Sequence, residues 1–143
     1  MSYTRYELPP TPTAADLKQA ADDYRAIICS VIRAIVERYQ RTPDYPFIDT
    51  KLNLITGEDF DDEDPIRGRG AVYGWIQGRG LESLVGHARF LKSDAQNDHL
   101  VAELDEMIEQ ITAQLQIMRS RNGGHLSFLM DPEGNPFHLA SDG

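Results

Sequence analysis

The sequence contains a single cysteine and no long apolar run. One cysteine cannot form a disulfide within the chain, and Cys29 lies in an apolar stretch, so we interpret it as a small buried hydrophobe rather than a nucleophile. No segment approaches the roughly 18 apolar residues that a transmembrane helix needs. The first residues also lack the apolar core of a secretory signal. We therefore expect a cytoplasmic protein.

Basic residues are also few. The chain has 14 lysines and arginines and 23 acidic residues, so its formal net charge is −9. Nucleic-acid binding needs a clustered basic face. The nearest approach to one, Arg67 and Arg69, lies beside an acidic run at residues 58–64. Anionic membranes also repel a negative chain. We expect neither a nucleic-acid nor a membrane partner.

The sequence shows no pattern typical of a metal or cofactor site. The acidic run lacks the central glycine and the distal glutamate of an EF-hand, so we interpret it as a solvated loop. The four histidines have no zinc-site spacing. We expect no metal and no cofactor.

Hydrophobic periodicity predicts three helices in a chain whose 143 residues suit one domain. Residues 1–13 are polar and rich in proline, which indicates an extended lead-in to a domain over residues 14–143. Thr13, with Asp16 three residues later, is typical of a helix cap. Apolar residues at steps of three and four predict helices over about 14–42, 71–93 and 95–122.

The regions outside these helices predict a long loop and a hairpin. Residues 43–67 hold three prolines and many acids and predict the loop. Residues 124–139 predict a C-terminal β-hairpin with a turn over Asp131–Asn135. The fold class is therefore all-α with a small C-terminal β-hairpin. Glycines at the start of the second helix indicate a delayed helix start or very close backbone packing.

The segment from Tyr73 to Leu84 carries the residues most typical of a binding site. Trp75 and Arg79 share a face whether the segment is helical or extended. An aromatic plate beside a guanidinium suits a sugar ring and its hydroxyls, and Gln77 offers one donor and one acceptor. The alternative is that Trp75 belongs to the core and that Arg79 pairs with Glu82 or with a loop acid.

Two ordered motifs add a family resemblance to this interpretation. The first is Trp75–Ile76–Gln77–Gly78–Arg79, followed by a long helix. The second is Gly123–Gly124–His125 with the turn Asp131–Pro132–Glu133–Gly134–Asn135–Pro136. In this order they resemble the N-acylglucosamine 2-epimerase family. The layout agrees over residues 14–139, and the motifs themselves lie within residues 73–91 and 123–136.

The resemblance implies a fold and an activity. The family fold is an (α/α)₆ toroid, so this chain would be an incomplete toroid of antiparallel helix pairs. The reaction is proton abstraction and return beside a carbonyl or hemiacetal carbon of a small sugar. Arg79 would be the catalytic residue that stabilises the enediolate, and the sugar-binding residues would be Tyr73, Trp75, Gln77 and Glu82.

The family's acid and base are two histidines on later helices, and no histidine of this chain matches them. We therefore expect the N-terminal portion of an epimerase or isomerase that is inactive alone. Its open apolar faces would be covered by a homo-oligomer or by a further C-terminal part of the same chain. Two alternatives stay open: a small helical interaction module without catalysis, or a fragment of a toroid glycoside hydrolase, for which Glu82 is the only carboxylate near the motif.

Overall fold

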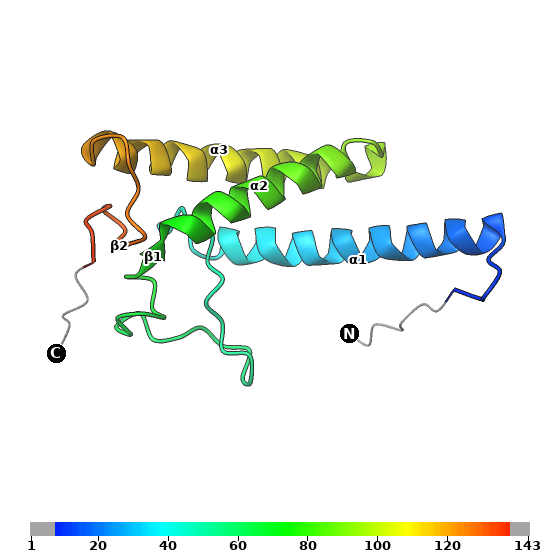
Figure 1. Cartoon of the computed structure of the whole chain (residues 1–143), viewed down its shortest axis with the longest axis horizontal. Helices are drawn as coiled ribbons and strands as arrows, with labels where there is room; N and C mark the ends of the chain where they lie inside the picture. Colours follow the sequence, from blue (N-terminus) through cyan, green and yellow to red (C-terminus); the bar gives the residue numbers. More distant parts are fainter. Residues whose placement is uncertain (1–7, 138–143) are drawn as a thin grey trace. The chain divides into compact units, whose positions relative to one another are not determined.

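The structure is a computed structural model that describes residues 8–137 and is mostly helical (Figure 1). The chain divides into two compact units, one ending at Glu37 and one beginning at Arg38. The elements in chain order are α1 (Ala14–Gln40), β1 (Val72–Tyr73), α2 (Gly74–Leu91), the 3₁₀ turn η1 (Ala95–Asn97), α3 (Asp98–Arg121) and β2 (Leu129–Met130).

Helix α1 begins where the sequence predicts, because Thr13 and Asp16 form a capping box. The backbone N–H of Asp16 donates to Thr13 Oγ1 over 3.2 Å, and Asp16 Oδ2 accepts the backbone N–H of Thr13 over 2.8 Å. The hydroxyl and backbone N–H of Thr13 both lower the pKa of this carboxyl. The helix ends at Gln40, just before the predicted limit. Of the predicted lead-in, residues 8–13 form no helix or strand, and residues 1–7 lie outside the described part.

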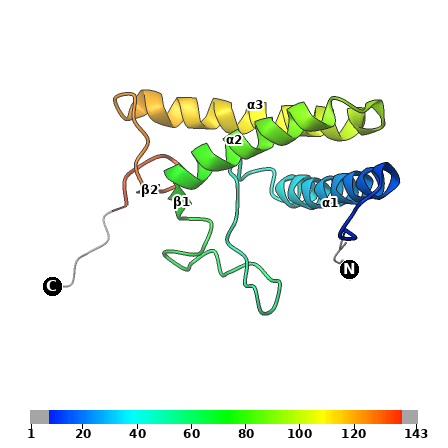
Figure 2. The same cartoon turned by 45° about the vertical axis from the view of Figure 1, so that its right-hand side comes forward.

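Helices α2 and α3 pack against each other as an antiparallel pair, which both views show (Figures 1 and 2). Between them, Asp94 caps η1 by accepting the backbone N–H of Gln96 over 3.1 Å. The predicted third helix is thus a 3₁₀ turn followed by α3. Its buried stripe follows the predicted period of three and four: Leu100, Val101, Leu104, Met107, Ile111, Leu115 and Met118.

The predicted hairpin at residues 124–139 forms only in part. Its turn is present: Gly134 has φ 95°, and Asp131 Oδ1 accepts the backbone N–H of Asn135 over 2.8 Å. Within the hairpin, Met130 and Pro136 form an isolated bridge. The longer pairing of β2 is antiparallel and goes to β1, far away in the sequence, with Tyr73 opposite Leu129. Residues 138 and 139 lie outside the described part.

Helix α2 begins at Gly74 and not at residue 71, because β1 precedes it. The backbone N–H of Gly74 donates to Phe128 O over 3.0 Å, which continues the pairing of β1 with β2. A Cβ atom at position 74 would lie 2.5 Å from Ser127 O, a backbone atom. The glycines indicated either a delayed start of the helix or very close backbone packing, and both occur at Gly74.

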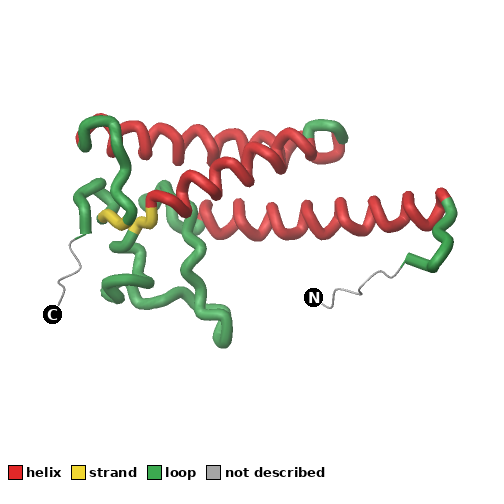
Figure 3. The backbone as a smooth tube through the Cα atoms, in the orientation of Figure 1, coloured by secondary structure: helices red, strands yellow, loops and turns green. Residues whose placement is uncertain are grey.

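A long loop, residues 41–71, connects α1 with β1 and is drawn in green in Figure 3. It contains no helix or named strand, but Leu52 and Asp59 form an isolated bridge. Tyr45 and Phe47 are buried and pack edge to face with ring centroids 5.1 Å apart. No helix within residues 8–137 combines the length and apolar character that crossing a membrane requires.

The close approach at Gly74 gives the first testable prediction. Gly74→Ala should lower the free energy of unfolding by about 1–3 kcal/mol, because the backbone carbonyl of Ser127 cannot yield without shifting β2. Urea unfolding followed by circular dichroism measures this. Gly86→Ala in the same helix is the control: no atom lies within 4 Å of its added Cβ, so it should stabilise by about 0.5–1 kcal/mol. Equal effects of the two substitutions would contradict the close approach.

Candidate functional site

The helical form of residues 74–91 sorts the predicted site residues onto two sides of α2. Trp75, Arg79 and Glu82 are exposed and follow one another at steps of four and three, so they share a face. Gln77 is buried, with 2% of its surface exposed. The structure therefore brings three of the predicted residues together and turns Gln77 away from them.

The exposed face carries an aromatic platform made by Trp75 and Phe128. Their rings are stacked with centroids 6.5 Å apart and an interplanar angle of 13°. Trp75 is 50% exposed and Phe128 is 70% exposed. Tyr73 meets Phe128 edge to face at 6.1 Å, and its hydroxyl donates to Ile66 O over 3.2 Å. Tyr73 therefore supports the platform from β1.

An apolar groove adjoins the platform and has a volume of about 390 Å³. Its walls come from the loop, from β1 and from the C-terminal turn: Ile66, Tyr73, Ser127, Phe128, Leu129, Pro136 and Phe137. Sequence reasoning missed both the groove and Phe128. The only signal for Phe128 was its place in a predicted strand, which does not say that the ring reaches Trp75.

Arg79 and Glu82 have no bonded partner in the described part of the chain. Neither makes a hydrogen bond or an ion pair with residues 8–137. The alternative pairing of Arg79 with Glu82 or with a loop acid is therefore not formed. The guanidinium of Arg79 is left with its donors open to a ligand beside Trp75.

Gln77 uses its side-chain amide to hold the loop. Its Oε1 accepts the backbone N–H of Ile48 over 2.8 Å, and its Nε2 donates to Ile48 O over 3.0 Å. Each polar atom of the amide thus pairs with a backbone group, as a neighbouring strand would pair. The side chain of Ile48 also lies against Gly80, where an added Cβ would collide with it. The sequence predicted that the Gln77 amide binds a sugar, but in the structure this amide is bonded to the loop.

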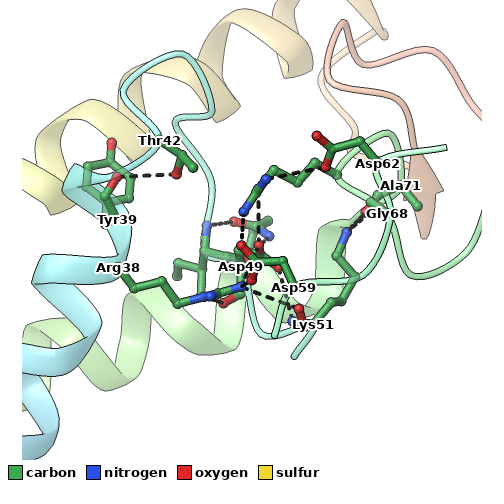
Figure 4. Close-up of polar contacts among 12 residues, drawn as sticks. Arg38, Tyr39, Thr42, Asp49, Lys51, Asp59, Asp62, Gly68 and Ala71 are labelled. Atoms are coloured by element: carbon green, nitrogen blue, oxygen red, sulfur yellow. Dashed lines mark hydrogen bonds and ion pairs between the residues drawn. The ribbon is translucent and has the colours of Figure 1, made fainter. Parts of the chain in front are cut away.

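A ring of alternating charges fixes the middle of the loop to the last residues of α1 (Figure 4). Arg38 Nη2 lies 3.0 Å from Asp49 Oδ2 and 2.6 Å from Asp59 Oδ1. Arg69 Nη2 lies 2.5 Å from Asp59 Oδ2, and Arg69 Nε lies 3.5 Å from Asp49 Oδ2 without the alignment of a hydrogen bond. Asp62 adds a weaker contact to Arg69 Nη1 at 3.4 Å. We call Arg38, Asp49, Asp59 and Arg69 the charge ring.

Lys51 closes the other end of the loop. Its Nζ donates to Gly68 O over 2.6 Å and to Ala71 O over 2.5 Å (Figure 4). Burial is the main reason that the pKa of Lys51 is lowered. Because both bonds end on backbone carbonyls, this lysine holds the chain directly before β1 in place.

The acidic run at residues 58–64 is largely exposed, as the sequence predicts, but some of its aspartates are also bonded to neighbouring groups. Hydrogen bonds from the backbone and side chain of Arg67 and from the backbone of Ile66 lower the pKa of Asp64 to about 2. Asp59 belongs to the charge ring. Partial burial raises its pKa, but the hydrogen bonds and charges of Arg38 and Arg69 outweigh burial and lower it overall. Within residues 8–137, histidine, cysteine, aspartate and glutamate side chains form no group of three that could hold a metal ion.

No protein-family model matches the chain, and neither a curated protein nor a solved structure gives a significant match. The resemblance to the epimerase family therefore stays a prediction from the two motifs.

The two hydrogen bonds between the Gln77 amide and the backbone of Ile48 predict that a variant of similar side-chain volume without the amide is less stable. Gln77→Leu keeps the side-chain volume but leaves a backbone N–H and a carbonyl without their partners. The free energy of unfolding should fall by about 2–4 kcal/mol in urea titrations. Gln96→Leu, at an exposed position of η1, should change it by less than about 0.5 kcal/mol. If both variants unfold alike, the amide does not anchor the loop.

The charge ring predicts a dependence of stability on pH. Because the pKa of Asp59 is lower in the folded chain than its ordinary value of about 3.9, its contribution is present above about pH 4. That contribution is lost as pH falls through the folded value. Asp59→Asn should lower the free energy of unfolding by about 0.5–1 kcal/mol at pH 6 and by little at pH 2.5. The effect at pH 6 is small because this carboxylate is exposed, and water screens its ion pairs. Urea unfolding between these pH values measures it.

Asp44→Asn is the matched control, because Asp44 is exposed in the same loop and makes no ion pair with the described residues. Its unfolding free energy should follow that of the unmodified chain at each pH. A constant difference between Asp59→Asn and the unmodified chain across the range would count against the ion pairs.

Proposed function

We propose that the exposed face of α2 binds a small sugar, and that the chain acts as the N-terminal portion of a carbohydrate epimerase or isomerase. One observation carries this proposal: Trp75 is half exposed, and Arg79 follows it on the same face without a bonded partner in the described part of the chain. Exposing a tryptophan to water is unfavourable, and an aromatic ring beside a guanidinium suits a sugar ring and its hydroxyls.

The geometry of the face suits one pyranose. The Trp75 ring offers an apolar surface to the C–H face of the sugar, and Phe128 keeps that ring in place by stacking on it. Arg79 lies one helical turn further along α2, about 6 Å from Trp75 along the axis. A guanidinium there reaches hydroxyl or carbonyl oxygens at the sugar's edge.

The same placement supports a role in epimerisation. Removal of a proton beside a carbonyl carbon moves negative charge onto the oxygen, and a guanidinium at that oxygen stabilises the developing charge. In this proposal Arg79 does this, Trp75 and Tyr73 position the sugar, and Glu82 accepts a hydroxyl hydrogen bond. Gln77 acts on the site through the loop. The proton acid and base come from outside this chain, since no histidine here matches the pair in the family it resembles.

The toroid belongs to the same proposal. Helices α2 and α3 form one antiparallel pair, which is the repeating unit of an (α/α)₆ toroid. We propose that further helix pairs complete the ring around the exposed face of α2. A toroid glycoside hydrolase is less well supported, because such enzymes need two carboxylates and Glu82 stands alone among the predicted site residues.

A helical interaction module is the second candidate, and one observation favours it. Leu54 and Ile55 are 94% and 96% exposed at a hydrogen-bonded turn of the loop. Large apolar side chains in this position are typical of a surface that another protein covers.

Binding can be measured directly, because Trp75 is the only tryptophan of the chain. Titration with N-acetylglucosamine, N-acetylmannosamine, glucose and mannose should shift or quench its fluorescence for at least one sugar. Arg79→Ala should weaken that binding tenfold or more, which corresponds to about 1.4 kcal/mol. The emission of the free chain should not change, because Arg79 makes no hydrogen bond, ion pair or ring contact with the other described residues.

The matched control is Arg89→Ala, which removes an exposed arginine from the last turn of the same helix. It should bind as the unmodified chain does. If no sugar alters the fluorescence, or if both variants bind alike, the sugar site is wrong. Association of the chain that Leu54→Ser abolishes, measured by sedimentation equilibrium, would then favour the interaction module.

A further inference from the structure

The apolar groove beside the platform has no role in the binding of a simple sugar. It is lined mainly by Ile66, Tyr73, Phe128 and Phe137, and none of its wall residues is charged. A groove of about 390 Å³ is large enough for a chain of several carbons and lies in the usual size range of small-molecule sites. Hydroxyl groups would lose their hydrogen bonds to water there without regaining them.

The groove and Arg79 lie on opposite sides of Trp75 along α2. Tyr73, a wall of the groove, precedes Trp75, whereas Arg79 follows it by one turn. Phe128 belongs both to the platform and to the groove wall, so the two apolar surfaces are continuous. A sugar whose carbonyl end faces Arg79 therefore directs its other end, the side of carbons 4 to 6, toward the groove.

We propose that the ligand is a sugar with an apolar acyl or alkyl substituent on the end away from its carbonyl carbon, and that this substituent lies in the groove. The inference rests on the proposed sugar site and adds the class of ligand. It follows from the continuity of the two surfaces and from the absence of charge among the groove's described walls. The carbonyl carbon and its neighbour stay free, so the substituent is compatible with epimerisation.

The test compares glucose with 6-O-octanoyl-glucose, titrated against the full chain below the micelle concentration of the ester. Trp75 fluorescence reports both. The ester should bind at least tenfold more tightly than glucose, because several methylene groups leave water. Octanol alone is titrated as the apolar part without the sugar.

Two isoleucines of similar exposure make a matched pair of variants. Ile66, in the groove wall, is 49% exposed, and Ile117, on α3, is 44% exposed. Ile66→Ser should reduce the advantage of the ester at least fivefold and leave glucose binding unchanged. Its backbone bonds to Asp64 and Tyr73 do not involve the side chain and should remain. Ile117→Ser should keep the full advantage.

The outcomes separate the two proposals. If glucose and the ester bind equally, the substituent is wrong and the sugar site stands. If neither changes the fluorescence, both are wrong. If octanol binds as tightly as the ester and glucose does not bind, the groove is a general apolar site and both are again wrong. An advantage of the ester that Ile66→Ser and Ile117→Ser reduce equally would also overturn the groove assignment.

Discussion

The double hydrogen bond between the Gln77 amide and the backbone of Ile48 is the constraint on which the described site depends. A loop of about thirty residues without helix carries many backbone groups that need partners, and a buried amide supplies two of them at one point. Once Gln77 faces the loop, the helical repeat requires Trp75 and Arg79 to face the opposite way. The exposure of the proposed sugar site and the anchoring of the loop are thus two consequences of one side chain's orientation.

The strand pairing adds the second half of the site. Residues 72 and 73 are extended because they pair with residues 129 and 130, and the small size of Gly74 lets the two backbones approach. This pairing carries Phe128 to Trp75 although more than fifty positions separate them in the sequence. Local propensity does not bring the two rings together, but a short antiparallel ladder does. The platform and the groove therefore depend on the same few backbone bonds.

What could be predicted from the sequence was local. The capping box at Thr13, the apolar stripe of α3 and the turn at Gly134 depend on contacts within a few residues, and such patterns are visible in one sequence. Phe128 could not be placed, because its partner lies on another element. The charge ring was missed for a similar reason: Arg38 and Arg69 are far apart in the chain, and an acidic run beside basic residues does not reveal which side chains meet. The role of Gln77 in anchoring the loop was also missed, because its place between Trp75 and Arg79 indicated a sugar-binding residue.

The charge ring also restricts how this sequence can change. Each arginine of the ring contacts both aspartates, so the loss of one member leaves each of its neighbours with one partner of opposite charge instead of two. A lysine is a poor replacement, because a single ammonium group lacks the fork that reaches two carboxylates at once. Positions 38, 49, 59 and 69 should therefore change together or not at all among descendants of this chain. Such a correlated set would be visible in aligned relatives as covariation between the end of one helix and three separate positions of a loop.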